Sequence, residues 1–105
     1  MRVILYKVAM PTTHLINGKP VTVITFAAKE DKTDGKGKVQ QFYVVSNPNS
    51  FASNRAFSRL LFAKSNDILE LGLGVSPNNL GGPSLPGYGA KVFAVENISS
   101  PVYNF

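Results

Sequence analysis

The residues of this chain best suited to binding chemistry are lysines and aromatic side chains that follow one another closely in the sequence. Lys29, Lys32, Lys36 and Lys38 lie in or beside the polar segment 30–38. Three acidic residues share this segment, so its four lysines leave a net charge of about +1. Ammonium groups contact phosphates and ring faces stack on unpaired bases, so the combination indicates binding of a polyanion with exposed bases.

Two β-rich runs flank the lysine segment and must position it. The run 21–28, opened by Pro20, is rich in β-branched residues and contains Phe26. The run 39–45 places Phe42 and Tyr43 beside valines and glutamines. Such composition favours strands, and the glycine steps between the runs favour a reversal. The sequence therefore predicts a hairpin whose cationic tip reaches into solvent.

The aromatic residues of this hairpin are candidate stacking platforms. Phe42 and Tyr43 are consecutive, so they are expected on opposite faces of the sheet, one as a platform and the other in the core. We favour Tyr43 as the exposed ring because its hydroxyl is easily hydrated, and the opposite assignment stays open. Phe26 is likewise either an exposed stacking platform or a core residue. Tyr6 and Tyr88 are further candidates, with ordinary packing as their alternative.

The cationic candidates also have an ordinary interpretation. The hairpin lysines are predicted phosphate contacts, and the alternative is a solvated hairpin kept soluble by charge. Lys7 and Lys91, together with Arg2, extend the predicted groove. Arg55 and Arg59 lie one helical turn apart on the predicted helix. They are candidates for contact with nucleic acid, and the alternatives are the solvent face of the helix or a contact with another subunit.

Composition narrows the class of protein. The 105 residues contain 44% hydrophobic and 16% charged residues with a net charge of +5, which predicts one folded domain, residues 1–98, followed by a tail, 99–105. The absence of cysteine excludes disulfides and thiolate chemistry, and a single histidine, His14, excludes a histidine pair on a metal. We expect no enzyme, no cofactor, no membrane segment and a cytoplasmic location.

The remaining elements complete an all-β domain with one helix. Asn17-Gly18 is the strongest turn signal, and a short excursion over 12–16 precedes it. The predicted strands are Arg2–Val8, Val21–Ala28, Val39–Val45, Ile68–Val75 and Ala90–Ile98, with a helix over Phe51–Lys64 and a long loop over Ser76–Gly89. Five short strands avoid free edges by closing into a β-barrel, and a helix between the third and fourth strands is the OB-fold arrangement.

The same segments resemble the bacterial single-stranded-DNA-binding protein family. Asn17-Gly18-Lys19-Pro20-Val21 is similar to the turn and second strand of that family, and Phe42-Tyr43-Val44-Val45 to its third strand. Ile68-Leu69-Glu70-Leu71-Gly72 is similar to the strand after the helix. The resemblance covers residues 2–75, and the last strand aligns by position.

The chain also departs from that family in three places. It has no tryptophan, Ala9-Met10-Pro11 replaces the expected glycine-asparagine pair, and it ends in Pro101-Val102-Tyr103-Asn104-Phe105 without an acidic tail. It looks more like a small phage- or plasmid-type single-stranded-DNA-binding protein, or a primosomal OB-fold helper.

The resemblance implies a homodimer or homotetramer that binds single-stranded DNA, with RNA as a further possibility, during replication or recombination. The alternative is a structural or interaction β-barrel of a phage assembly, or an inhibitor module.

Overall fold

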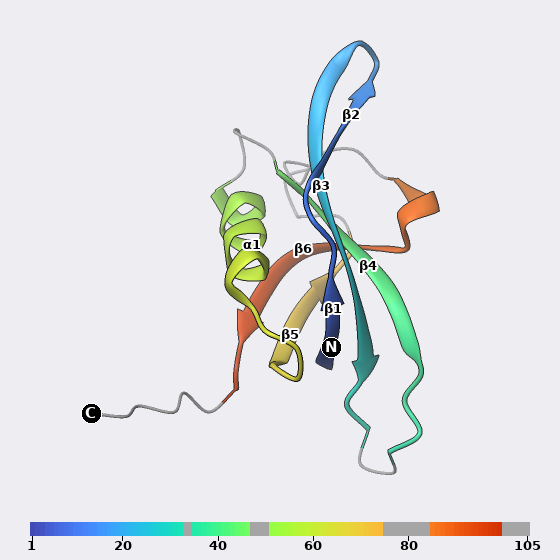
Figure 1. Cartoon of the computed structure of the whole chain (residues 1–105), viewed down its shortest axis with the longest axis vertical. Helices are drawn as coiled ribbons and strands as arrows, with labels where there is room; N and C mark the ends of the chain where they lie inside the picture. Colours follow the sequence, from blue (N-terminus) through green and yellow to red (C-terminus); the bar gives the residue numbers. More distant parts are fainter. Residues whose placement is uncertain (33–34, 47–50, 75–84, 100–105) are drawn as a thin grey trace, which may run out of the picture.

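The computed structural model describes residues 1–32, 35–46, 51–74 and 85–99, and they form a mostly β structure with one α-helix (Figure 1). The strands are β1 (Arg2–Val8), β2 (Thr12–Ile16), β3 (Lys19–Glu30), β4 (Val39–Ser46), β5 (Ile68–Leu73) and β6 (Ala90–Asn97). The α-helix is α1 (Phe51–Phe62), and a short 3-10 helix, η1 (Pro86–Tyr88), precedes β6.

The five predicted strands are confirmed to within one or two residues at most of their ends, and the structure adds a sixth. Residues 12–16, expected as an excursion, form β2 and pair with β3 in a hairpin. The predicted turn lies between them, because Asn17 and Gly18 have φ angles of 52° and 76°. This left-handed pair is what a two-residue hairpin turn requires. Val75, the last residue of the predicted fourth strand, lies outside the described residues.

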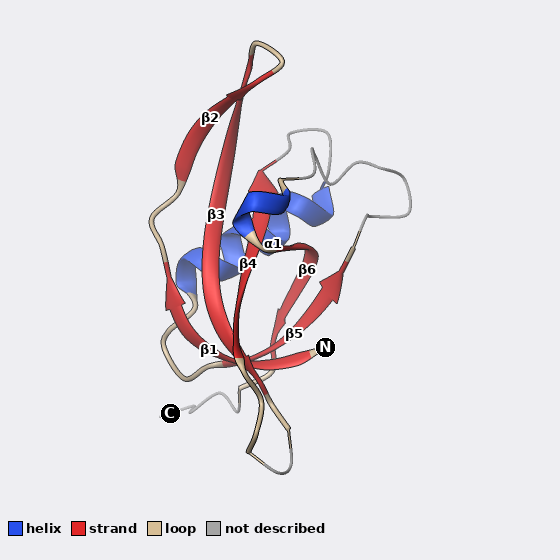
Figure 2. Ribbon diagram, turned by 90° about the vertical axis from the view of Figure 1, so that its right-hand side faces the viewer, coloured by secondary structure: helices blue, strands red, loops and turns tan. Residues whose placement is uncertain are grey.

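The strands form one sheet that closes on itself. The order is β1-β5-β6-β4-β3-β2, and β1 also pairs with β3. Five strands therefore form a ring, β1–β5–β6–β4–β3–β1, and β2 lies beside β3 beyond the end of β1 (Figure 2). All pairs are antiparallel except β4 with β6, which is parallel.

The inside of this ring holds the main hydrophobic core. Phe26 on β3 and Phe42 on β4 stack with ring centroids 5.2 Å apart, and both rings are buried. Aliphatic side chains of all five strands of the ring and one face of α1 complete the cluster: Val3, Leu5, Ile24, Ala28, Val44, Ala56, Leu60, Leu69, Leu71, Val92 and Val95. Inward-pointing residues alternate along β3, β4 and β5, as the period of two requires, whereas β1 and β6 each contain a step of three residues where the register shifts.

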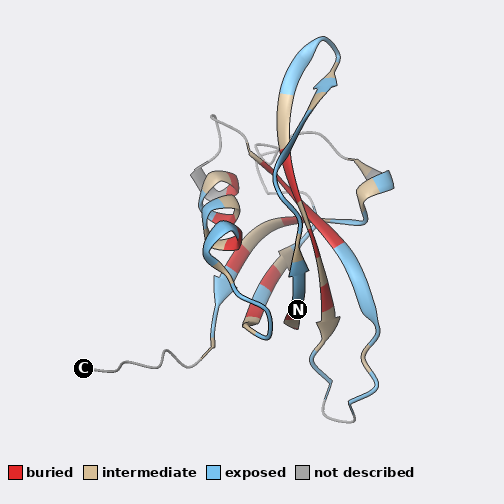
Figure 3. Cartoon of the chain, in the orientation of Figure 1, coloured by how far each residue is buried: buried red, intermediate tan, exposed pale blue. Residues whose placement is uncertain are grey.

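A second, smaller cluster lies on the opposite face of β3 and β4. Val23, Tyr43 and Val45 are buried there, and the half-buried Leu85 and Tyr88 pack against them. As a result β4 is buried on both faces from Phe42 to Val45, and Figure 3 shows this buried stretch in the middle of the strand. The segment that carries η1 therefore covers part of the outer surface of the sheet.

Helix α1 connects β4 to β5 and packs against β4 and β6. Among the described side chains of α1, Ser53, Ala56 and Leu60 are buried, and the Ser53 hydroxyl donates a hydrogen bond to the Val45 carbonyl. Phe57 is half-buried against the core, but Leu61 is 48% exposed, so the helix faces the core through Leu60 rather than Leu61. The helix ends at Phe62, two residues before the predicted end.

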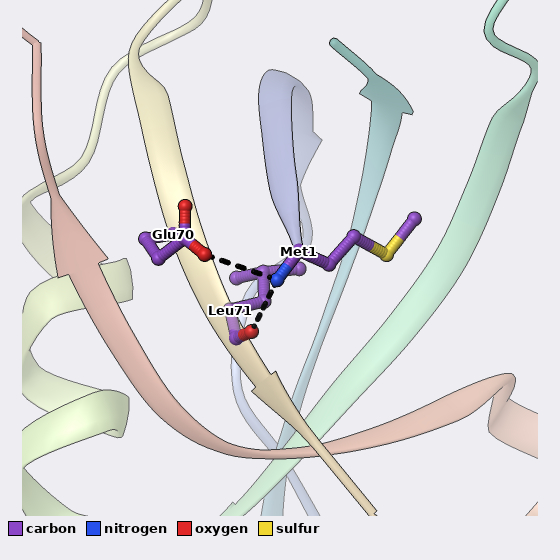
Figure 4. Close-up of polar contacts among 3 residues, drawn as sticks. All are labelled: Met1, Glu70 and Leu71. Atoms are coloured by element: carbon purple, nitrogen blue, oxygen red, sulfur yellow. Dashed lines mark hydrogen bonds and ion pairs between the residues drawn. The ribbon is translucent and has the colours of Figure 1, made fainter. Parts of the chain in front are cut away.

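The first residue is bound to β5 (Figure 4). The amino group of Met1 donates to Glu70 Oε1 at 3.1 Å and to the Leu71 carbonyl at 3.0 Å. The Leu71 amide in turn donates to the Met1 carbonyl at 2.7 Å. These contacts continue the β1–β5 ladder by one residue. In the described part of the chain, no helix has the length and apolar character needed to cross a bilayer.

Candidate nucleic-acid interface

A β-bulge in β1 places an aromatic ring and a lysine next to each other on the outside of the ring of strands. The register against β3 shifts between Leu5 and Lys7, so Tyr6 has no partner. Leu5 is buried and Val8 packs against the core, which leaves both intervening residues outside. Tyr6 is 66% exposed and Lys7 is exposed. In a regular strand Tyr6 and Lys7 would point to opposite faces of the sheet. The bulge changes the direction of one side chain, so both lie on the same face.

Beside this pair lies a shallow groove of about 220 Å³. It crosses β1, β3 and β4 and is lined by Lys7, Ala9, Thr25, Phe26, Ala27 and Gln41. The register explains the grouping, because Ala27 is the partner of both Lys7 and Gln41. Small side chains and an amide at this point let a ligand approach the sheet closely. The groove therefore combines a mainly apolar lining with two polar side chains, Thr25 and Gln41, and the cation of Lys7.

Two further candidate lysines lie toward the tip of the β3–β4 hairpin. Lys29 is half-buried and is the partner of Ile4 on one side and Val39 on the other. Lys38 precedes β4 and is exposed. Among the described residues no ion pair involves Lys7, Lys29 or Lys38, so their charges are not neutralised by a described acid. Of these three lysines, Lys7 lines the groove, and contacts of Lys29 and Lys38 with a phosphate stay a prediction.

The tip itself is only partly cationic. Lys32 lies 3.6 Å from Glu30 Oε2 and forms an ion pair with it, which weakens its attraction for an external phosphate. Lys36 is exposed. The Gly35 amide donates to the Lys32 carbonyl at 2.9 Å and forms part of the reversal. Thr33 and Asp34 of the predicted segment lie outside the described residues.

Lys91 is placed differently from the other candidates. It is the partner of Tyr43 in the parallel β4–β6 pair, next to the second cluster. Burial lowers the pKa of Lys91 below its ordinary value. Desolvation of the ammonium group makes this site less accessible to a phosphate than Lys7 or Lys38. Lys91 therefore borders the candidate surface but does not line the groove.

The expected stacking platforms on β3 and β4 are not exposed, and this corrects the prediction. Phe26, Phe42 and Tyr43 are at most 2% exposed. Phe26 and Phe42 lie in the main core, as one of the two interpretations held, but Tyr43 is buried as well. The Leu85 amide donates to the Tyr43 hydroxyl at 2.6 Å, and the Tyr88 ring packs edge-on against the Tyr43 ring.

The physical reason is that alternation identifies the two faces of a strand but not what covers them. Tyr43 does point away from Phe42, as predicted, but the segment 85–89 covers its face. Tyr88 is half-buried, and its hydroxyl lies 3.1 Å from His14 Nδ1 on β2. Gly89 allows close approach of this segment, because a Cβ there would lie 2.1 Å from the Gln41 carbonyl oxygen. Tyr43 and Tyr88, two of the three tyrosines predicted as stacking platforms, are therefore occupied in packing.

Sequence reasoning placed Tyr6 among the weaker candidates and did not include Thr25, Ala9 or Gln41. Strict alternation along β1 would place Lys7 on the same side as Leu5, and the bulge contradicts this. The sequence pattern that could have indicated the bulge is Leu5-Tyr6-Lys7-Val8, in which two residues that tolerate exposure to water separate two aliphatic residues. Such a break in alternation is typical of a bulge.

A second groove, of about 380 Å³, lies between α1 and the strands β5 and β6. Its rim carries two arginines and two acids: Arg55, Arg59, Glu70 and Glu96. Arg59 donates to the Val95 carbonyl at 2.8 Å and forms an ion pair with Glu96. The balanced charge makes this groove a poor phosphate site despite its larger volume. Arg59 is therefore used inside the protein.

No three His, Cys, Asp or Glu side chains of the described residues gather in a way that would hold a metal ion. Comparison of the chain with protein-family models, with curated proteins and with solved structures gives no match.

Proposed function

We propose that this protein binds single-stranded nucleic acid, DNA in the first place, with little sequence preference, across the outer surface of β1, β3 and β4. The observation that carries the proposal is the exposed pair Tyr6 and Lys7, of which Lys7 also lines the groove over β1, β3 and β4. A ring and an ammonium group side by side suit a base and its phosphate.

The strand arrangement supports the same function. Helix α1 lies between β4 and β5, and β4 and β6 are the parallel pair that completes the ring. We infer an OB-fold in which β3 and β4 correspond to its second and third strands. OB-folds bind oligonucleotides across those two strands and the loops beside them. The groove lies on β3, β4 and the adjacent β1.

Charge supports the proposal and sets its expected strength. Lys7, Lys29 and Lys38 have no described acid as a partner, and Lys36 is exposed at the tip. If these four lysines each neutralise one phosphate, log affinity falls with log salt at a slope near −3, since each phosphate on a single strand contributes about −0.7. Lys32 is not counted because Glu30 already pairs with it.

Titration of a fluorescein-labelled oligothymidine at several salt concentrations tests the proposal. We expect micromolar or tighter binding at low salt with the slope given above. An oligonucleotide duplex of equal length is the control, and it should bind more weakly because its bases are already stacked. Absence of salt-dependent binding to the single strand would contradict the proposed function.

A further inference from the structure

Strand β2 is the one described strand with a free edge. It pairs with β3 alone, at the end of the sheet order, whereas the other five strands each have two neighbours in the ring. The β2–β3 hairpin projects beyond the ring of strands (Figures 1 and 2). Its outer row of backbone amides and carbonyls has no strand partner among the described residues, and such a row pairs readily with another chain.

This edge lacks the features with which proteins usually prevent pairing. Soluble proteins place lysines, prolines or bulges on their edge strands. Residues 12–16 contain no charged side chain and no proline, and their register against β3 runs without a shift. The whole segment from Ala9 to Gly18 lacks Asp, Glu, Lys and Arg in a chain of net charge +5. The absence of charge here marks the segment as a contact surface.

Exposed apolar side chains accompany the free edge. Leu15 is 78% exposed, and Met10, which precedes the strand, is 84% exposed. Leu15 shares one face of the hairpin with Thr13 and with the exposed Pro20 opposite it. On the other face His14 contacts Tyr88. The hairpin is thus held to the body through one face, and in the described part of the chain Thr13, Leu15 and Pro20 on its other face are exposed.

We propose that β2 pairs antiparallel with β2 of a second copy of this chain about a two-fold axis. An antiparallel edge is complementary to itself, and a two-fold interface repeats one set of contacts twice. With the axis near His14, Leu15 lies opposite Thr13 of the second copy, and Thr12 opposite its Ile16. Pairs of this kind between β-branched and aliphatic residues stabilise sheets.

Charge favours a second copy as the occupant. Two chains of net charge +5 repel each other over most of their surfaces, and the uncharged 9–18 segment is where they can approach without opposing lysines. A partner of negative charge would instead be attracted to the lysine-bearing surface. The proposal does not depend on nucleic-acid binding.

Sedimentation of the nuclease-treated protein over a range of concentrations tests this interface. We expect a species of twice the 11.3 kDa chain mass that dissociates on dilution. Leu15→Lys should raise the dimer dissociation constant roughly tenfold or more, because two added lysines become diagonal neighbours across the axis. Phe62→Lys is the matched control, since this ring is equally exposed, on α1, and should leave the dimer intact.

Amide hydrogen exchange provides a second readout. Exchange over residues 12–16 should slow as protein concentration rises, while exchange over residues 68–73 of β5 should not change. A protein that stays monomeric at high concentration would overturn the proposal. A dimer that Leu15→Lys leaves intact, or that Phe62→Lys dissociates, would overturn it equally. Far-ultraviolet circular dichroism of both variants shows whether they fold.

Discussion

The two halves of the outer surface of β3 and β4 have the same strand geometry but different environments. In one half, Val23, Tyr43 and Val45 lie under the segment 85–89 and form a second small core. In the other half, Thr25 and Gln41 line an open groove beside Lys7. The strands and their register continue without interruption between the two halves. The halves differ in whether another chain segment packs on them. The presence of that segment, rather than the residue pattern of the strands, therefore decides which half is open to a ligand.

The largest expected contrast is in stability. Tyr43→Ala should lower the free energy of unfolding by about 3–5 kcal/mol, because it removes a buried ring and leaves a cavity. Gln41→Ala, two residues away in the open half, should change it by no more than about 0.5 kcal/mol. Urea denaturation of both variants measures the difference. Equal destabilisation by the two substitutions would contradict the distinction between the halves.

The open half should dominate binding. Tyr6→Ala should weaken affinity for oligothymidine by about 1–3 kcal/mol, the value of one base–aromatic stack, with the salt slope nearly unchanged. Tyr6→Phe keeps the ring and should bind like the original protein. If both substitutions weaken binding alike, the hydroxyl rather than the ring makes the contact. If neither does, the ring does not contact the ligand.

Removing only the hydroxyl in the covered half should have a smaller effect. Tyr43→Phe eliminates the hydrogen bond from the Leu85 amide and should cost about 1 kcal/mol of stability. Binding to oligothymidine should not change, because the hydroxyl is occupied inside the second cluster. Thermal unfolding and the binding titration, measured on the same sample, test both parts of this prediction.

The smallest expected effect is a difference between two cations, Lys7 and Arg55, in their contribution to the salt slope. Lys7→Gln should reduce the magnitude of the salt slope by about 0.7, since one phosphate contact is lost. Arg55→Gln, an exposed cation at the groove between α1 and β5–β6, is the control and should leave the slope unchanged. A slope that responds to Arg55 and not to Lys7 would move the binding surface to the other side of the molecule.

Local patterns were sufficient for much of the fold. β-Branched runs, the Asn17-Gly18 turn and helical spacing after Ser50 predicted five strands and the helix, because each depends on neighbours in sequence. They did not predict β2, since five residues with mixed polarity carry little strand signal. The β1 bulge was also missed, although two consecutive outward residues marked it.

The candidate site was harder to predict because it depends on contacts between distant segments. Whether Tyr43 meets water is decided by Leu85 and Tyr88, more than 40 positions further along the chain. No pattern within residues 39–45 contains that information. The exposure of most lysines was easier to predict, because a charged side chain usually stays in contact with water, and Lys29 and Lys91 are the half-buried exceptions among the candidates.

The central claim is that a single strand of nucleic acid lies across the open half of this surface, and backbone amide NMR tests it most directly. On titration with oligothymidine, we expect shift changes at Lys7, Thr25, Ala27 and Gln41 and little change at Val23 and Val45. Shift changes concentrated on α1 and β5, or none at all at saturating oligonucleotide, would contradict the account.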